Sequence, residues 1–345
     1  MLKLAVVSGK AGGLQAMLPM LSHFEASNRW DVLLYLCDQH RYDVAVKTPH
    51  NTTLLISDIR RPRTEHLFEA MGQLDHAWQT DTPDLVIVYG DRADALLGAT
   101  VAHELRIPIA HLQAGDITGG VDNRNRYATT MLSTWAFCST PEAALRVTLA
   151  DAVIKDKHPL RVHTVGDHHL DAVLVVKTEA RRPIPVDPRA YVLVHMHPDT
   201  LISAESNVCI LKKLIRALSP YPTIWMPPCT DLHADAMREA YKAAGITLHP
   251  IVPLSDYVEI LLGARCFIGN SSATILDAPA LGIPTIQIGS RQRLRGSGPG
   301  LVDPRDIREA VTSVPWFINP TPTLARYGKG KAGAETFEIL NGAFE

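Results

Sequence analysis

Carboxylates that could transfer protons lie directly after apolar runs of the chain. Asp91 follows the run Leu85–Tyr89, and a long polar loop that holds Asp116 and Asp122 follows the next such run, Pro108–Leu112. Open α/β sheets bind ligands at the carboxyl ends of their parallel strands, so these positions suit acid or base catalysis. The alternative for a single carboxylate such as Asp91 is the cap of the helix that follows it.

A second group of residues could bind an anion. Gly269 ends an apolar run, and Asn270, Ser271 and Ser272 stand where the next helix is expected to begin. Free backbone N–H groups, the helix dipole and hydroxyl donors together favour a phosphate at such a position. The alternative is an ordinary serine cap that binds nothing. Asp277, further along the same helix, could reach a ribose hydroxyl.

Two histidines, His195 and His197, leave the end of another expected strand. Their spacing places both side chains on one side of the strand if it continues through them. A zinc pair would need a third ligand, which the sequence does not offer, and the five cysteines form no CxxC pair. We therefore expect an acid–base or substrate-binding histidine and no metal. The odd, scattered cysteines also indicate reduced thiols, as in cytoplasmic proteins.

Short apolar runs and amphipathic stretches alternate along the first half of the chain. Strands are expected at Leu2–Ser8, Asp31–Cys37, Thr52–Ser57, Asp84–Gly90, Pro108–Leu112, Thr134–Ser139 and Leu160–Val165. Helices are expected at Gly13–Glu25, Thr64–Thr80, Asp91–Leu105 and Pro141–Leu149. Several of the strands are apolar throughout, which is typical of parallel strands covered on both faces. This alternation predicts a doubly wound α/β domain.

The second half repeats the pattern after a proline-rich connector. Strands are expected at Ala190–His195, Pro222–Met226, Thr247–Ile251, Cys266–Ile268 and Thr285–Ile288, and helices at Ala204–Leu218, Asp231–Ala244, Ser255–Leu262 and Ala273–Leu281. We predict two Rossmann-like α/β domains, 1–182 and 188–320, and a segment, 321–345, that packs back on the first. Two such domains resemble the GT-B architecture of nucleotide-sugar enzymes, which implies an active site in the interdomain cleft.

Length and charge narrow the function further. At 345 residues the chain is too long for one ordinary core, so two domains are expected. Its 34 Lys+Arg nearly balance 36 Asp+Glu and form no basic block, which argues against a nucleic-acid partner. No apolar run approaches the length of a membrane-spanning helix, and no cleavable signal follows Met1. We expect a soluble cytoplasmic protein without a membrane partner.

Five motifs, in the same order along the chain, resemble those of the hydrolysing UDP-N-acetylglucosamine 2-epimerases. Gly90–Leu96 is similar to the family's GDRF(E/D)-L signature, and Ile107–His111 with Gly115–Asp122 is similar to its IPIAHIEGGE-TG-D segment. His197–Thr200 resembles its HPxT motif, Ile268–Ser272 its IGNSS motif, and Ile283–Gln292 its GIP-INIG-RQ motif. The resemblance spans both expected domains.

The resemblance implies a reaction and a set of residues. The nucleotide leaves by elimination across C1–C2, and water then adds with inverted configuration at C2, without a nicotinamide or metal cofactor. The implied catalytic residues are Asp91, Asp116, Asp122 and His197; the implied substrate-binding residues are Arg92, Gln113, Arg126, Asn270, Ser271, Ser272, Asp277, Arg291 and Arg295. A homodimer is also implied.

Several positions depart from the family pattern around the sugar and the nucleotide. Gln113 stands where the family has a catalytic Glu, and an amide cannot take a proton. The loop Gly9–Gly13 lacks the family's Arg and Asp, and Asp277 is shorter than the family's Glu. The burden of removing the C2 proton then falls on another carboxylate, and we favour Asp122 because the family keeps an acid there.

The sequence therefore leaves more than one function open. The favoured function is a hydrolysing nucleotide-sugar 2-epimerase that acts on UDP-N-acetylglucosamine or a modified relative and releases a C2-inverted amino sugar. One alternative is a nucleotide-sugar hydrolase with a changed sugar or base and no inversion at C2. Another is a non-catalytic nucleotide-sugar-binding protein. A GT-B glycosyltransferase fits the architecture, but the ordered motifs speak against it.

Overall fold

The computed structural model describes residues 1–37, 51–55, 63–118, 122–154, 159–179, 191–229, 232–292, 294, 301–303, 306–312 and 324–345. Internal contacts divide the chain into two compact units. Unit 1 contains Met1–Ile117, Val121–Val175 and Arg326–Glu345, and unit 2 contains Thr118–Gly120 and Val176–Ala325. The sequence-based limits at 182 and 188 lie outside the described residues and stay a prediction.

Unit 1 is built on a parallel sheet. Within the described residues its strands lie in the order β3-β2-β1-β4-β5-β6-β7, and every neighbouring pair is parallel. The strands are β1 (Leu2–Ser8), β2 (Trp30–Leu36), β3 (Asn51–Leu54), β4 (Leu85–Tyr89), β5 (Ile109–Ala114), β6 (Trp135–Cys138) and β7 (Arg161–Thr164). The order reverses between β1 and β4, which is the switch point where doubly wound sheets bind ligands.

Helices cover both faces of this sheet. The helices of unit 1 are α1 (Ala11–Ala26), α2 (Arg63–Thr80), α3 (Ala93–Glu104), α4 (Asp122–Met131), α5 (Pro141–Ile154) and α13 (Ala332–Ala343). Two further helices, α6 (His168–Glu179) and α12 (Leu324–Tyr327), cross the limits between the two units. Apolar side chains of α1 and α13 pack on one face, and those of α2 and α3 pack on the other. With both faces buried, the strands can be apolar along their whole length.

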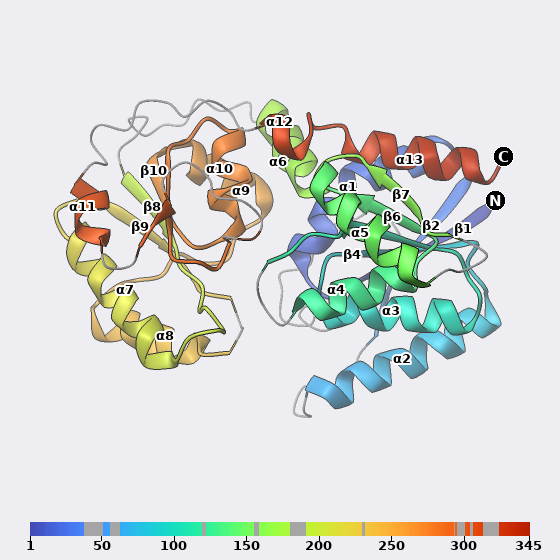
Figure 1. Cartoon of the computed structure of the whole chain (residues 1–345), viewed down its shortest axis with the longest axis horizontal. Coiled ribbons are helices and arrows are strands. Elements are labelled where there is room, and N and C mark those ends of the chain that lie inside the picture. Colours follow the sequence, from blue (N-terminus) through green and yellow to red (C-terminus); the bar gives the residue numbers. More distant parts are fainter. Residues whose placement is uncertain are drawn as a thin grey trace. The chain divides into compact units, whose positions relative to one another are not determined.

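The helix α13 lies against α1 although the chain has passed through unit 2 in between (Figure 1). Gly333 makes this close approach possible, because a Cβ atom there would lie 3.0 Å from the backbone nitrogen of Met20. Two side chains of α6 hold the start of α13: Nε2 of His168 lies 2.9 Å from Oγ1 of Thr336, and Oδ2 of Asp171 accepts from the amide of Gly333 at 2.7 Å.

Unit 2 has a second parallel sheet. In its described part the strand order is β12-β11-β10-β8-β9. The elements are β8 (Tyr191–His195), α7 (Ala204–Leu218), β9 (Thr223–Met226), α8 (Ala234–Ala243), α9 (Leu254–Leu262), β10 (Ala264–Gly269), the 3₁₀ helix η2 (Ser272–Thr274), α10 (Asp277–Ala280), β11 (Thr285–Ile288), β12 (Leu301–Val302) and α11 (Ile307–Thr312). The predicted fold class, two doubly wound α/β domains, is confirmed.

Some expected elements differ in the structure. The strand expected at Thr247–Ile251 is wrong, since Leu248 forms only a single bridge with Trp225. The helix expected at Ala273–Leu281 is divided into η2 and α10, and Pro279 has no N–H to bond the carbonyl oxygen of Ile275, which lies between the two. No helix among the described residues is long and apolar enough to cross a membrane.

Candidate active site

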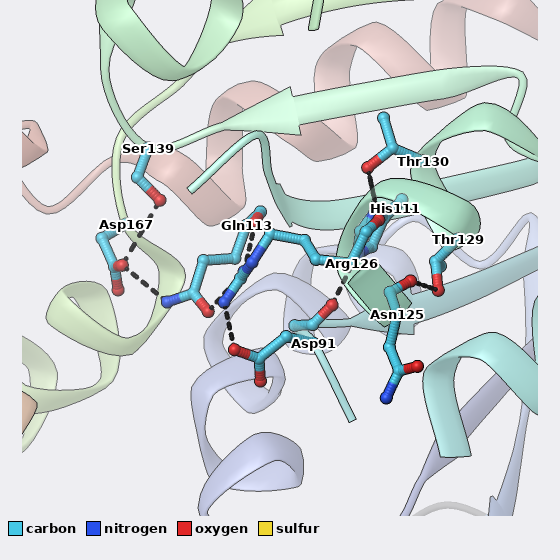
Figure 2. A network of polar contacts seen from close by, with 10 residues as sticks. Asp91, His111, Gln113, Asn125, Arg126, Thr129, Thr130, Ser139 and Asp167 are labelled. Atoms are coloured by element: carbon cyan, nitrogen blue, oxygen red, sulfur yellow. Dashed lines mark hydrogen bonds and ion pairs between the residues drawn. The ribbon is translucent and has the colours of Figure 1, made fainter. Parts of the chain in front are cut away.

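The candidate site of unit 1 forms where two neighbouring strands end. Strands β4 and β5 pair in parallel, so Asp91, just after β4, and Gln113, near the end of β5, come to the same edge of the sheet. Helix α4 follows and brings Arg126 to them. Figure 2 shows these side chains pointing toward one another. The sheet topology therefore collects residues that lie up to 35 positions apart in sequence.

Arg126 joins the two strand ends. Its Nη2 atom donates to Oδ2 of Asp91 at 2.6 Å, and its Nη1 atom donates to the backbone oxygen of Gln113 at 2.6 Å and to Oε1 of the same residue at 3.2 Å. The Arg126 side chain is fully buried, whereas that of Asp91 is 21% exposed. A guanidinium stays protonated even when buried, so Asp91 carries the matching negative charge and is the part of the ion pair that solvent can reach.

The backbone aims Gln113 at Arg126. Gln113 is the extra residue of a bulge, because the register between β5 and β6 shifts between Leu112 and Ala114. Its φ of 60° lies in the left-handed region, which non-glycine residues adopt at a cost of about 1 kcal/mol. The bulge turns both the carbonyl and the side-chain oxygen of Gln113 toward one guanidinium nitrogen.

The amide nitrogen of Gln113 reaches a carboxylate that the sequence analysis did not single out. Nε2 of Gln113 donates to Oδ2 of Asp167 at 3.1 Å, and Asp167 is only 1% exposed. Its other oxygen, Oδ1, accepts from the amides of His169 at 2.9 Å and Leu170 at 3.2 Å, which caps helix α6. The signal for this residue was present: an Asp after Gly166, directly before a helical pattern, is typical of a helix start.

His111 holds the backbone just before Asp91. Its Nε2 atom lies 2.8 Å from the carbonyl oxygen of Gly90, which can only accept, so Nε2 carries a proton. Burial lowers the pKa of His111 to about 4, and the nearby Arg126 cation lowers it too. The ring is therefore neutral, and Nδ1 lies 2.9 Å from the hydroxyl of Thr130, which donates to the carbonyl oxygen of Arg126 at 2.8 Å. A neutral His111 adds no positive charge beside the ion pair of Asp91 and Arg126.

The remaining predicted residues of unit 1 lie in different surroundings. Asp116 is buried, 5% exposed, in the turn after β5, and Asp122 is an exposed first residue of α4, one helical turn before Arg126. Nε of Arg92 lies 3.4 Å from Asp94, whose other oxygen accepts from the amide of Gly9 at 2.8 Å. The structure thus gathers Asp91, Gln113 and Arg126 by direct contacts.

The candidate site of unit 2 centres on Asn270. Its side-chain amide bonds the backbone of His197 twice, accepting from the nitrogen at 2.7 Å and donating to the oxygen at 2.8 Å. The main-chain oxygen of Asn270 accepts from Nη1 of Arg291 at 3.4 Å and from Nε2 of Gln292 at 3.3 Å. Asn270 therefore connects the loops after β8, β10 and β11 through its side chain and its main-chain oxygen. Arg295 lies outside the described residues.

The serine pair follows a strand end that must be glycine. A Cβ atom on Gly269 would lie 2.0 Å from the carbonyl oxygen of His195, so the two strands pack too closely for any side chain there. Oγ of Ser271 accepts from the amide of Ala273 at 3.4 Å and caps η2, while Ser272 is less buried. Asp277 is 3% exposed and begins α10.

The two histidines of unit 2 both carry their proton on Nε2, but they donate in different surroundings. Burial lowers the pKa of His195 to about 4, and its Nε2 donates to the carbonyl of Pro227 at 3.2 Å. In His197, Nδ1 accepts from the amide of Cys229 at 3.0 Å, so the proton of the neutral ring is on Nε2. His197 can therefore act as a hydrogen-bond donor to an anion. The described residues contain no group of three or more metal-binding side chains.

Comparison with known proteins agrees with this two-part α/β arrangement. The chain is a two-domain protein of GT-B type: its fold matches the crystal structure of UDP-GlcNAc 2-epimerase from Neisseria meningitidis bound to UDP-GlcNAc, with a TM-score of 0.78 over 99% of this chain and 100% of that one, at 18% identity. The family model described as UDP-N-acetylglucosamine 2-epimerase matches residues 33–341. The chain belongs to that family, as its motifs predicted.

Two curated relatives indicate the breadth of the family around this chain. A UDP-N,N'-diacetylbacillosamine 2-epimerase (hydrolyzing) of Legionella pneumophila is 25% identical over 82% of this chain and 78% of its own length. A GDP/UDP-N,N'-diacetylbacillosamine 2-epimerase (hydrolyzing) of Campylobacter jejuni is 24% identical over 79% of this chain and 72% of its own. These names include hydrolysing enzymes and sugars other than N-acetylglucosamine.

Proposed function

We propose that this protein is a hydrolysing 2-epimerase of a nucleotide-linked amino sugar, either UDP-N-acetylglucosamine or a modified relative such as a diamino sugar. The observation that carries the proposal is the contact of Arg126 with Asp91 and Gln113, which places an ionised carboxylate at the sheet edge where α/β proteins bind ligands. Membership in the 2-epimerase family supplies the class of reaction.

The proposed reaction has two steps. A carboxylate removes the proton from C2 of the sugar, a C1=C2 double bond forms, and the C1–O bond breaks with its electron pair leaving on the nucleotide diphosphate. Water then adds across the double bond, giving a proton to C2 from the opposite face and a hydroxyl to C1. The products are the free nucleotide and a C2-inverted amino sugar.

We assign the roles within unit 1 as follows. Asp122, exposed at the first turn of α4, is the base for the C2 proton. Asp91, held by its ion pair with Arg126, orients the sugar and stabilises the positive charge that develops at C1 in the second step. Gln113 and Arg92 bind sugar hydroxyls, and Asp116 is a further candidate acid or base.

Unit 2 is assigned to the nucleotide. Nε2–H of His197 donates to the leaving diphosphate, and the hydroxyls of Ser271 and Ser272 add donors beside it. Asp277 binds the ribose, and Arg291, held at Asn270, contributes positive charge. We assign the same role to Arg295 by its place in the motif.

A test of this function uses a panel of UDP- and GDP-linked amino sugars in heavy water. Nucleotide release and the configuration of the freed sugar are read by NMR. The proposed mechanism predicts a C2-inverted sugar that carries deuterium at C2, because the proton added in the second step comes from solvent. Release without inversion or deuterium would instead indicate hydrolysis at C1, and binding without release would indicate a non-catalytic protein.

The cellular setting is part of the same proposal. The five cysteines are odd in number and form no CxxC pair, which supports a reducing compartment such as the cytoplasm. A homodimer is proposed from the family resemblance. Light scattering on the purified chain measures its mass directly, and a monomer would contradict the proposed dimer without touching the proposed reaction.

A further inference from the structure

We propose that Asp167 is a positioning residue of the candidate active site and acts on Asp91 and Asp122 through Gln113 and Arg126. The inference rests on the proposed function, since it concerns how that site is held for the reaction. Asp167, Gln113, Arg126 and Asp91 form a continuous line of contacts, which we call the Arg126 line (Figure 2).

Asp167 does more than cap a helix. The cap of α6 uses only Oδ1, which accepts from the amides of His169 and Leu170. Oδ2 points the other way and accepts from Nε2 of Gln113 at 3.1 Å and from the hydroxyl of Ser139 at 3.4 Å. With its two oxygens fixed by separate groups of donors, the carboxylate is a rigid acceptor facing Gln113.

This acceptor determines which way the Gln113 amide points. A side-chain amide has one donor end and one acceptor end. Arg126 can only donate, so it needs the oxygen of Gln113; Oδ2 of Asp167 accepts, so it needs the nitrogen. Both neighbours require the same orientation, and neither could be served by the flipped amide. Asp167 thus determines that the oxygen of the Gln113 amide, and not its nitrogen, faces Arg126.

The orientation of the Gln113 amide affects the positions of both candidate carboxylates, Asp91 and Asp122. Oε1 of Gln113 and the nearby backbone oxygen hold Nη1 of Arg126, which leaves Nη2 to bond Asp91. Arg126 also belongs to α4, whose first residue is Asp122, so fixing the guanidinium anchors the helix that carries Asp122. Errors of about 1 Å in such positions can cost a hundredfold in rate.

Exchanging the amide and the carboxylate gives a specific test. Asp167→Asn keeps an oxygen for the helix cap, since Asn is as good a capping residue as Asp. Its nitrogen, however, would face the nitrogen of Gln113 and force that amide to flip away from Arg126. Gln113→Glu instead sets a second carboxylate against Asp167. In the double variant Gln113→Glu/Asp167→Asn, a carboxylate oxygen at position 113 accepts from Arg126, as the amide oxygen does in the wild type, and the amide at position 167 donates to that carboxylate.

The four proteins are compared for steady-state kinetics and thermal unfolding, with the nucleotide sugar that the wild type turns over best. We expect each single variant to lower kcat about tenfold or more with little change in KM, and the double variant to recover to within about threefold of wild type. Thr129→Val is the control: Thr129 is buried on the same helix, and its hydroxyl donates to the carbonyl oxygen of Asn125. It should lower stability without changing kcat.

The outcomes separate this inference from the proposed function. Turnover by the wild type with no recovery of kcat in the double variant would overturn the role of Asp167 and leave the function standing. Recovery of the unfolding temperature alone would assign the contact to stability and would equally overturn positioning. A wild type that consumes none of the nucleotide sugars would overturn the proposed function, and the catalytic consequence of this contact with it.

Discussion

Arg126 Nη2 and Asp91 Oδ2 lie 2.6 Å apart, and this ion pair connects helix α4 to the end of strand β4. The arginine is fully buried and the aspartate partly exposed. Desolvating a guanidinium costs several kcal/mol, which a single neutral contact would not offset. A buried cation at the edge of the sheet where β4 and β5 end is therefore typical of a functional charge and not of a surface contact.

Removal of this cation should damage both stability and function. Arg126→Met leaves Asp91 without its buried partner, and we expect the free energy of unfolding to fall by about 3 kcal/mol. Nucleotide release should fall by about a hundredfold or more, because Asp91 loses its orientation. Urea unfolding and nucleotide-release assays measure the two effects. Arg124→Met, at an exposed position of the same helix, should change neither by much.

Asp122→Asn tests the assignment of the base. Because the amide keeps the size of the side chain but cannot take a proton, turnover should drop by about a hundredfold or more while the fold is retained. The same assay in heavy water reports deuterium at C2. Asp235→Asn is a matched control, an exposed aspartate in the first turn of α8. Full activity in Asp122→Asn would transfer the role of base to Asp91 or Asp116.

Loss of the serine pair tests the nucleotide site. Ser271→Ala/Ser272→Ala should weaken nucleotide binding by a few kcal/mol in calorimetry, since hydrogen bonds to charged groups contribute roughly 1.5–3 kcal/mol each. Ser271 also caps η2, so some loss of stability is expected. Ser203→Ala removes a cap of the same kind from α7 and controls for that loss. Equal nucleotide affinity in all three proteins would rule this site out.

The two side chains that hold α13, His168 and Asp171, should affect the pH dependence of the free energy of unfolding in opposite directions. Burial lowers the pKa of His168 to about 4, so its contribution is present above pH 6.5 and lost as pH falls toward 4. Burial raises the pKa of Asp171 to about 6, so its contribution is present below pH 3.8 and lost as pH rises toward 6. Each contribution to the free energy of unfolding is on the order of 3 kcal/mol. Because the two contributions change in opposite directions between pH 4 and 6, their changes nearly cancel in that range.

Single substitutions should uncover each dependence. In Asp171→Asn, the free energy of unfolding should rise more steeply with pH between 4 and 6 than in wild type, because the falling contribution is gone. In His168→Gln the rise should be shallower. Urea unfolding at a series of pH values measures both. The same slope in all three proteins would mean that neither group titrates differently in the folded chain.

The sequence predicts the strands with more success than the functional geometry. Leu2–Ser8 and Thr285–Ile288 have the predicted bounds, because apolar runs between glycine, proline and polar residues are typical of buried parallel strands. Helix α4 stands where the sequence predicts a polar loop, because Asp122–Met131 has no apolar periodicity. Burial of Arg126 is a tertiary effect that local pattern does not contain.

The same difference between local sequence pattern and tertiary contacts explains which site residues the sequence could identify. Asp91 and Asn270 could be found because each directly follows a strand, where topology places ligand-binding groups. The partners of Gln113 could not, because Asp167 lies 54 positions further along the chain and meets it only when β5 and the start of α6 have been placed. The motif identified position 113, but only the contacts in the structure show that the amide of Gln113 bonds both Arg126 and Asp167.

The return of α13 to unit 1 has a consequence for biosynthesis. The ribosome releases residues 1–175 first, yet the core around α1 is complete only when residues 326–345 have emerged, after the whole of unit 2. Until then, the apolar side of α1 that α13 covers is open to water and to chaperones. Unit 2 is contiguous apart from Thr118–Gly120, so it can form its own core while the first unit is still waiting for its last helix.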